Sequence, residues 1–123
     1  MYSRKDKEDT KMYTTSTLKF MPYAQATVRR YENGDIYMIS YRTVVIRLSA
    51  DGWLTCTGTY SRTTIRHIGA FMKEFVSLPN GERGSYYMAK EAYLGGYAIN
   101  IYTGEVRPLE GEWSPPLLLL AAR

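Results

Sequence analysis

The chain has 123 residues, of which 45% are hydrophobic and 23% are charged, a composition typical of a soluble globular protein. Its single cysteine excludes an internal disulfide, and with one histidine no metal-ligand spacing appears, so we expect no metal and no cofactor. We expect a single domain over residues 1–123, with residues 1–10 mobile and residues 112–123 forming a tail rich in proline and leucine.

Neither end of the chain carries a membrane signal. The N-terminal "MYSRKDKEDTK" is charged throughout and lacks the apolar core of a signal peptide. The run "LLLLAA" near the C-terminus is far shorter than the roughly 20 apolar residues that span a bilayer. We therefore expect a cytoplasmic protein without membrane contact, whose leucines dock within the chain or across a homodimer.

The first half of the chain is predicted to be β-structure. Residues 25–31 and 36–40 read as strands, and Asn33-Gly34 between them is typical of a type I′ hairpin turn, which needs two positive φ values. Residues 43–49 ("TVVIRLS") and 53–59 form two further strands, joined by a turn at Asp51-Gly52. Tyr41 and Arg42 form a bend or bulge between two strands, or lie within one long bent strand.

The alternation in residues 43–49 assigns side chains to the two faces of that strand. Val44, Ile46 and Leu48 are predicted to share one face, with Val45 and Arg47 on the other.

After residue 60 the hydrophobic period changes to that of a helix. Ser61 suits the N-cap, because its hydroxyl can accept an otherwise unpaired backbone N–H. The predicted buried stripe consists of Ile65, Ile68, Met72 and Phe75. A loop over residues 78–84 separates this helix from a shorter one over residues 85–94, which ends at Gly95-Gly96.

A final hairpin is predicted from residues 97–102 and 105–109. Taken together, the elements predict an α+β fold: a small curved antiparallel β-sheet, a meander, with one main helix and a second short helix packed on it.

Positive charge is concentrated between residues 41 and 73, a segment that contains five basic residues and one acidic residue, Asp51. A local positive field favours phosphate or an acidic protein surface as a partner, although a solvated face of no particular role shows the same pattern. The candidate partner-binding residues are Arg42, Arg47, Tyr60, Arg62, Thr63, Arg66, Gly69 and Lys73.

The core of this candidate site is one side of the main helix. Arg62, Arg66, Gly69 and Lys73 follow helical spacing and should lie in line, away from the apolar stripe. Glycine within a helix costs about 1 kcal/mol relative to alanine, which indicates close approach of another backbone, either a partner's or the protein's own. The helix start could hold a phosphate or carboxylate, or its hydroxyls could simply cap the helix.

We do not expect an enzyme. His67 would need a partner acid, base or nucleophile, and Glu74 lies two helical turns away, about 10 Å along the axis. A hydrogen bond at the edge of the core is the expected role of His67, and Cys56 is expected to be a small buried hydrophobe.

The chain also holds twelve tyrosines against three phenylalanines. Tyrosine is enriched in binding interfaces and stacks on unpaired bases. Tyrosines also suit the half-exposed faces of a thin sheet for reasons of packing alone.

The strings "SYRTVVIRL", "DGWLTCTGTYSRTTIRHIGAF" and "GGYAINIYTGEV", between Ile36 and Val106, carry a family resemblance. The chain resembles small uncharacterised proteins of phages and mobile elements of Gram-positive and gut bacteria, in which a YSxTTxRHI turn into a helix follows a short β-meander. The resemblance implies no activity. The setting it implies is a bacterial host cell, in which such a protein binds nucleic acid or inhibits a host defence nuclease in the manner of an anti-CRISPR protein.

Two functions follow as hypotheses. The first is a non-enzymatic accessory protein that binds nucleic acid or a nucleoprotein through the basic helix face. The second is a protein–protein inhibitor or assembly factor that acts through its tyrosine-rich surface and leucine-rich tail.

Overall fold

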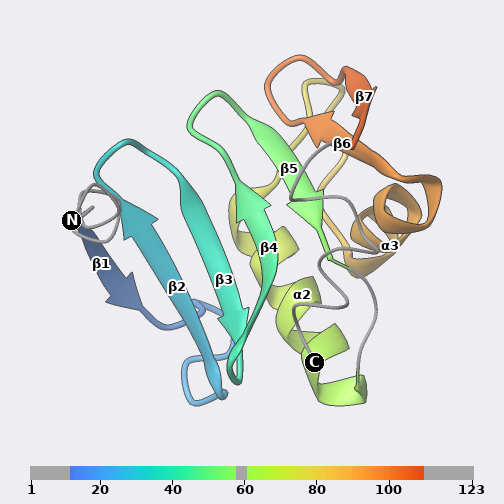
Figure 1. Ribbon diagram of the computed structural model, residues 1–123. Coiled ribbons are helices and arrows are strands. Elements are labelled where there is room, and N and C mark those ends of the chain that lie inside the picture. The colour runs from blue at the N-terminus through green and yellow to red at the C-terminus, as the bar shows by residue number, and fades with distance from the viewer. Residues whose placement is uncertain (1–11, 58–60, 110–123) are drawn as a thin grey trace, which may run out of the picture.

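A seven-stranded antiparallel sheet, with its strands in chain order from β1 to β7, forms the body of the molecule (Figure 1). The computed structural model describes residues 12–57 and 61–109, so the predictions for residues 1–10, for Tyr60 and for the tail at 112–123 lie outside the described residues. Two helices connect β5 to β6 and lie on one face of the sheet (Figure 1). The predicted α+β fold is confirmed.

The strands are β1 (Tyr13–Ser16), β2 (Ala26–Tyr31), β3 (Ile36–Ser40), β4 (Thr43–Leu48), β5 (Trp53–Cys56), β6 (Tyr97–Asn100) and β7 (Val106–Pro108). The helices are α2 (Arg62–Phe75) and α3 (Tyr86–Gly95). Ser61 is the N-cap of α2, as expected, Ser85 is the N-cap of α3, and α3 ends at Gly96 in the left-handed conformation, with φ of 71°. Within the part of the chain that the structure describes, no helix is long and apolar enough to cross a membrane.

The hairpin between β2 and β3 differs from the predicted type I′ turn. Gly34 N–H donates to the carbonyl of Tyr31 at 2.9 Å, and Gly34 has a φ of 99°, but Asn33 keeps a negative φ. The prediction of two positive φ values is therefore wrong. The cause is local: the Asn33 side chain accepts the backbone N–H of Asp35 at 2.9 Å, and this holds the asparagine in an ordinary turn conformation.

The turn between β3 and β4 is the two-residue loop Tyr41-Arg42, since Ser40 pairs with Thr43. Near this turn the register shifts between Met38 and Ile39, so that Met38 pairs with Ile46 while Ile39 pairs with Val44. This bulge moves Val44 to the face opposite Ile46, which contradicts the predicted alternation of β4. A regular strand cannot accommodate the extra residue without this exchange of faces.

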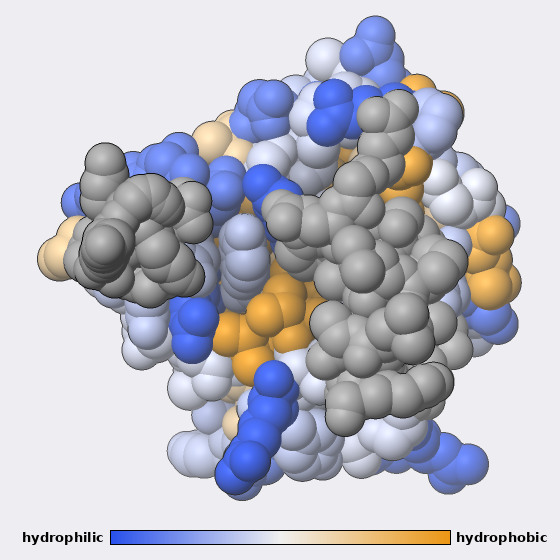
Figure 2. Space-filling model, in the orientation of Figure 1, coloured by the Kyte–Doolittle hydropathy of each residue, from blue (hydrophilic) through white to orange (hydrophobic). Residues whose placement is uncertain are grey.

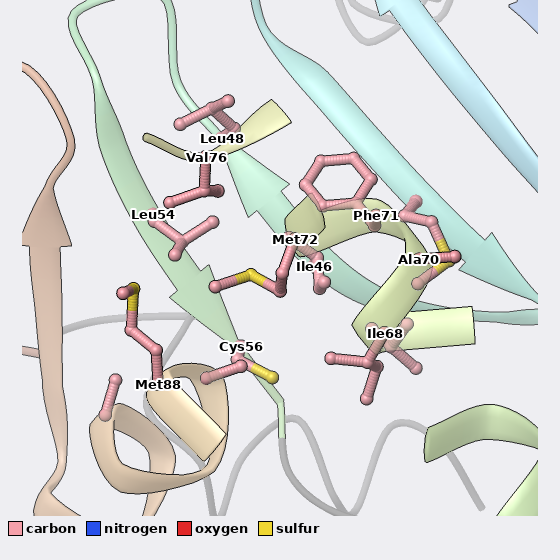
Figure 3. Close-up of a cluster of buried hydrophobic side chains, with 14 of the residues drawn as sticks. Ile46, Leu48, Leu54, Cys56, Ile68, Ala70, Phe71, Met72, Val76 and Met88 are labelled. Carbon is pink, nitrogen blue, oxygen red and sulfur yellow. The ribbon is translucent and has the colours of Figure 1, made fainter. Parts of the chain in front are cut away.

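The core lies between the helices and one face of the sheet (Figure 3). Ile46 and Cys56 of the sheet pack in this cluster with Ile68, Phe71 and Met72 of α2. Cys56 is buried, as expected.

The buried stripe of α2 is rotated from its predicted position. Ile68, Phe71 and Met72 are completely buried, whereas Ile65 and Phe75 are only half-buried. Burial in α2 is therefore centred near Thr64, Ile68 and Phe71, a set of which the prediction named only Ile68.

We call the opposite face of the sheet, which carries Arg29, Tyr37 and Arg47, the open face. These three residues alternate with buried neighbours such as Val28 and Met38, so their side chains point away from the core. Among residues 12–57 and 61–109, no helix covers the open face.

Candidate nucleic-acid interface

The outer side of α2 is basic and exposed. Arg62, Thr63, Arg66 and Lys73 are all solvent-exposed, while the inner side of the same helix is fixed in the core. On the exposed side, Arg62 and Arg66 lie about one helical turn apart, and Lys73 lies about two turns beyond Arg66. The structure therefore brings together four of the predicted site residues on one continuous helix surface.

The loop that precedes β2 adds a cation to this surface. Lys73 Nζ lies 4.5 Å from the centroid of the Phe20 ring, and Lys19 Nζ lies 5.5 Å from the same centroid. The backbone N–H of Lys19 donates to Glu74 Oε1 at 2.8 Å. Glu74 is the single carboxylate of α2, and this contact holds it at the loop.

A further cation, Arg30 of β2, lies with its guanidinium 5.0 Å from the centroid of the Phe75 ring, at the C-terminal end of α2. Sequence reasoning missed Lys19 and Arg30, because only the folded chain brings them beside a helix more than 30 residues further on. We call Lys19, Arg30, Arg62, Arg66 and Lys73 the basic face.

Gly69 lies on the side of α2 that faces the second helix. A Cβ atom on Gly69 would meet Tyr86 Cβ at 3.9 Å, an ordinary van der Waals contact. The structure therefore leaves space for a methyl group at this position, and close packing against α3 does not require the glycine.

Buried hydrogen bonds fix the start of α2 to the sheet. Ser61 Oγ accepts the backbone N–H of Thr64 at 3.2 Å, and Thr64 Oγ1 lies 3.0 Å from Ser40 Oγ. Ser40 Oγ in turn lies 2.8 Å from His67 Nδ1, so His67 makes the expected hydrogen bond. Because these hydroxyls bond one another, they serve the fold and orient the helix start.

His67 is 1% exposed, and its burial lowers the pKa of its imidazole from the ordinary 6.5. The Tyr41 ring covers it, with ring centroids 5.7 Å apart. Within residues 12–57 and 61–109, no group of three histidine, cysteine or acidic side chains could hold a metal ion.

The two strand arginines of the predicted site lie in different places. Arg42 is exposed in the β3–β4 turn, next to Tyr41 and therefore near the start of α2. Arg47 lies on the open face, where its guanidinium is 3.8 Å from an Asp35 carboxylate oxygen. The structure thus separates Arg47 from the helix cations, because neighbouring residues of a strand point to opposite faces.

Residues 9–88 match the model of a family of unknown function, DUF8033, and the chain therefore belongs to that family. The match covers β1 to β5, α2 and the start of α3. Comparison with curated proteins and with solved structures gave no match. The expectation of an uncharacterised family is confirmed, while the origin in phages or mobile elements and the YSxTTxRHI signature stay predictions.

Proposed function

For this member of a family of unknown function, we propose a non-enzymatic role in binding nucleic acid, or a nucleoprotein, through the basic face. The phosphate backbone of the nucleic acid would lie along the outer side of α2. The inner side of the helix is committed to the core, so that the cations can contact a partner without loss of packing.

The observation that carries this proposal is that α2 has three exposed cations and only one carboxylate, which is engaged by the neighbouring loop. Arg62, Arg66 and Lys73 share the helix with one acidic residue, Glu74, whose side chain accepts a backbone N–H of the neighbouring loop. Guanidinium groups present several donors in a planar fork that suits phosphate oxygens, and Lys73 adds a more flexible charge.

The setting of this activity is also a proposal. An accessory protein of a phage or mobile element would use such a surface in the bacterial cytoplasm, and inhibition of a host defence nuclease is one outcome of occupying a nucleoprotein. The basic face supports either role, because both present phosphates or an acidic surface to the helix.

The test is a salt titration of binding to a fluorescein-labelled single-stranded 20-mer, comparing the wild type with Arg62→Gln/Arg66→Gln. Loss of two phosphate contacts should lower the magnitude of the slope of log Kobs against log salt by about 1.4. The melting temperature should stay nearly unchanged, because exposed charges contribute little to stability.

The matched control is Arg83→Gln/Lys90→Gln, which removes the same charge from the α2–α3 loop and from α3. It should keep most of the wild-type slope. Equal slopes for the wild type and the Arg62/Arg66 variant would contradict the proposal. Binding to a protein partner that is insensitive to salt would favour the alternative, an inhibitor or assembly factor without nucleic-acid contact.

A further inference from the structure

Three tyrosines form a row across β1, β2 and β3 on the open face of the sheet. Tyr13 is directly opposite Tyr31, and their ring centroids are 5.2 Å apart. The ring centroids of Tyr31 and Tyr37 are 5.0 Å apart. We call Tyr13, Tyr31 and Tyr37 the tyrosine row.

Two arginines accompany the tyrosine row. The Arg29 guanidinium lies 4.5 Å from the centroid of the Tyr13 ring, and its Nη1 donates to the Tyr31 hydroxyl at 3.3 Å. The Arg47 guanidinium lies 5.8 Å from the Tyr37 ring centroid. Aromatic rings and guanidinium groups therefore alternate over four neighbouring strands.

The tyrosine row lies on a sheet face that no helix of residues 12–57 and 61–109 covers. A solvated face of an antiparallel sheet ordinarily alternates polar side chains with the buried ones of the other face. Here Tyr13 is 44% exposed, and Tyr31 and Tyr37 are half-buried. In the orientation of Figure 1, an apolar area lies near the centre of the visible side of the molecule, and hydrophilic residues lie beside it (Figure 2).

The electrostatics of the row also favour an anionic ligand. Asp35 pairs with Arg47, but Arg29 contacts tyrosines and has no carboxylate among its interactions within the described part of the chain. A guanidinium without a carboxylate partner can pair with a phosphate group of a ligand.

We propose that the tyrosine row, with Arg29 and Arg47, is a second nucleic-acid surface that binds unpaired bases of a single strand. The rings stack on the bases, and the arginines bind the phosphates between them. A duplex fits this surface poorly, because its bases are already stacked on one another. The surface goes beyond the basic face, since it lies on the opposite side of the sheet and recognises bases as well as phosphates.

The experiment separates base stacking from charge by using two labelled 20-mers, oligo(dT) and an abasic oligonucleotide with the same phosphates. The wild type should bind oligo(dT) about five- to 150-fold more tightly for each base that stacks. The variant Tyr13→Leu/Tyr37→Leu should bring the two affinities close together. Tyr13→Phe/Tyr37→Phe keeps the rings and should retain the preference for oligo(dT), and circular dichroism should show that each variant remains folded.

The outcomes distinguish this inference from the proposed function. Arg62→Gln/Arg66→Gln should lower the affinity for both oligonucleotides by the same factor and leave the ratio of the two affinities unchanged. Equal affinity of the wild type for oligo(dT) and the abasic strand would overturn the tyrosine-row inference and leave the basic face intact. Self-association that the leucine variant abolishes, without any base-dependent binding, would assign the row to a second copy of the chain and also overturn the inference.

Discussion

Tyr41 has the least favourable backbone conformation among the residues other than glycine that the structure describes, with a φ of 59°. It occupies the first central position of the β3–β4 turn, where a type II′ turn normally carries glycine. Its side chain is 55% exposed and lies over the ring of His67. Strain of this kind is retained where a particular side chain is needed, and the ring that shields His67 is the reason the structure offers.

The strain at Tyr41 can be measured by comparing two small substitutions. Tyr41→Ala and Tyr41→Gly both remove the ring, but only glycine adopts the positive φ without steric cost. Chemical denaturation should therefore find the glycine variant about 1 kcal/mol more stable than the alanine variant. An alanine variant as stable as the glycine variant would show that the turn carries no strain.

His67 provides a prediction about pH. Its pKa is lower in the folded protein than the 6.5 expected in the unfolded chain, because burial disfavours the charged ring. The neutral ring's contribution to stability is complete above about pH 6.5. It is lost as the pH falls toward the folded-state pKa, because only the unfolded chain then binds the proton.

The measurement is the free energy of unfolding between pH 7 and pH 5.5 for the wild type and His67→Asn, whose amide can replace the hydrogen bond to Ser40. The wild type should lose stability over this range, and the variant should change less. Parallel curves for the two proteins would show that His67 does not titrate differently on folding.

At the scale of elements, two glycines play different roles, one within α2 and one in the loop before α3. Gly69 faces α3 with room for a methyl group, because its nearest neighbour would be 3.9 Å away. Gly84, in the loop before α3, packs against the end of α2, where a Cβ atom would lie 2.6 Å from Val76 Cβ and closer still to the Met72 carbonyl oxygen. Its N–H also donates to the Val76 carbonyl at 2.9 Å, so this loop closes over the helix end.

These two sites give opposite predictions for the same substitution. Gly69→Ala should stabilise the protein by up to about 1 kcal/mol, because alanine has the higher helix propensity. Gly84→Ala should destabilise it by about 1–3 kcal/mol, because the added methyl group forces the loop away from α2. Thermal or urea unfolding of both variants measures the contrast, and a neutral Gly84→Ala would mean that the loop moves at little cost.

At the scale of the whole molecule, the sheet separates two surfaces of different chemistry. The basic face presents cations around α2, and the open face presents the tyrosine row. The excess of basic over acidic residues is therefore divided between the two sides, with Arg62 and Arg66 on one and Arg29 and Arg47 on the other. A window of sequence that contains both Arg47 and Arg62 cannot reveal this division, because it depends on the direction in which each strand residue points.

Features set by neighbouring residues could be predicted from the sequence. Ser61 caps the start of α2 and Gly96 caps the end of α3 through bonds to residues within a few positions, so both follow from the local sequence. Strand β1 escaped prediction because "YTTS" is short and exposed throughout and is ordered by pairing with β2. The place of Lys19 and Arg30 in the candidate site could not be predicted either, because the residues of α2 beside which they lie are distant in sequence.

The strand order has a consequence for how the chain folds. From β1 to β5 every strand pairs with the next one along the chain, so these contacts close short loops and can form as each hairpin is completed. The pairing of Leu54 with Ile99 is different, because both helices intervene between its two strands. Closing that long loop costs the most chain entropy in the sheet. The late step of folding should therefore be the docking of β6 on β5, after α2 and α3 have packed against a meander that is already formed.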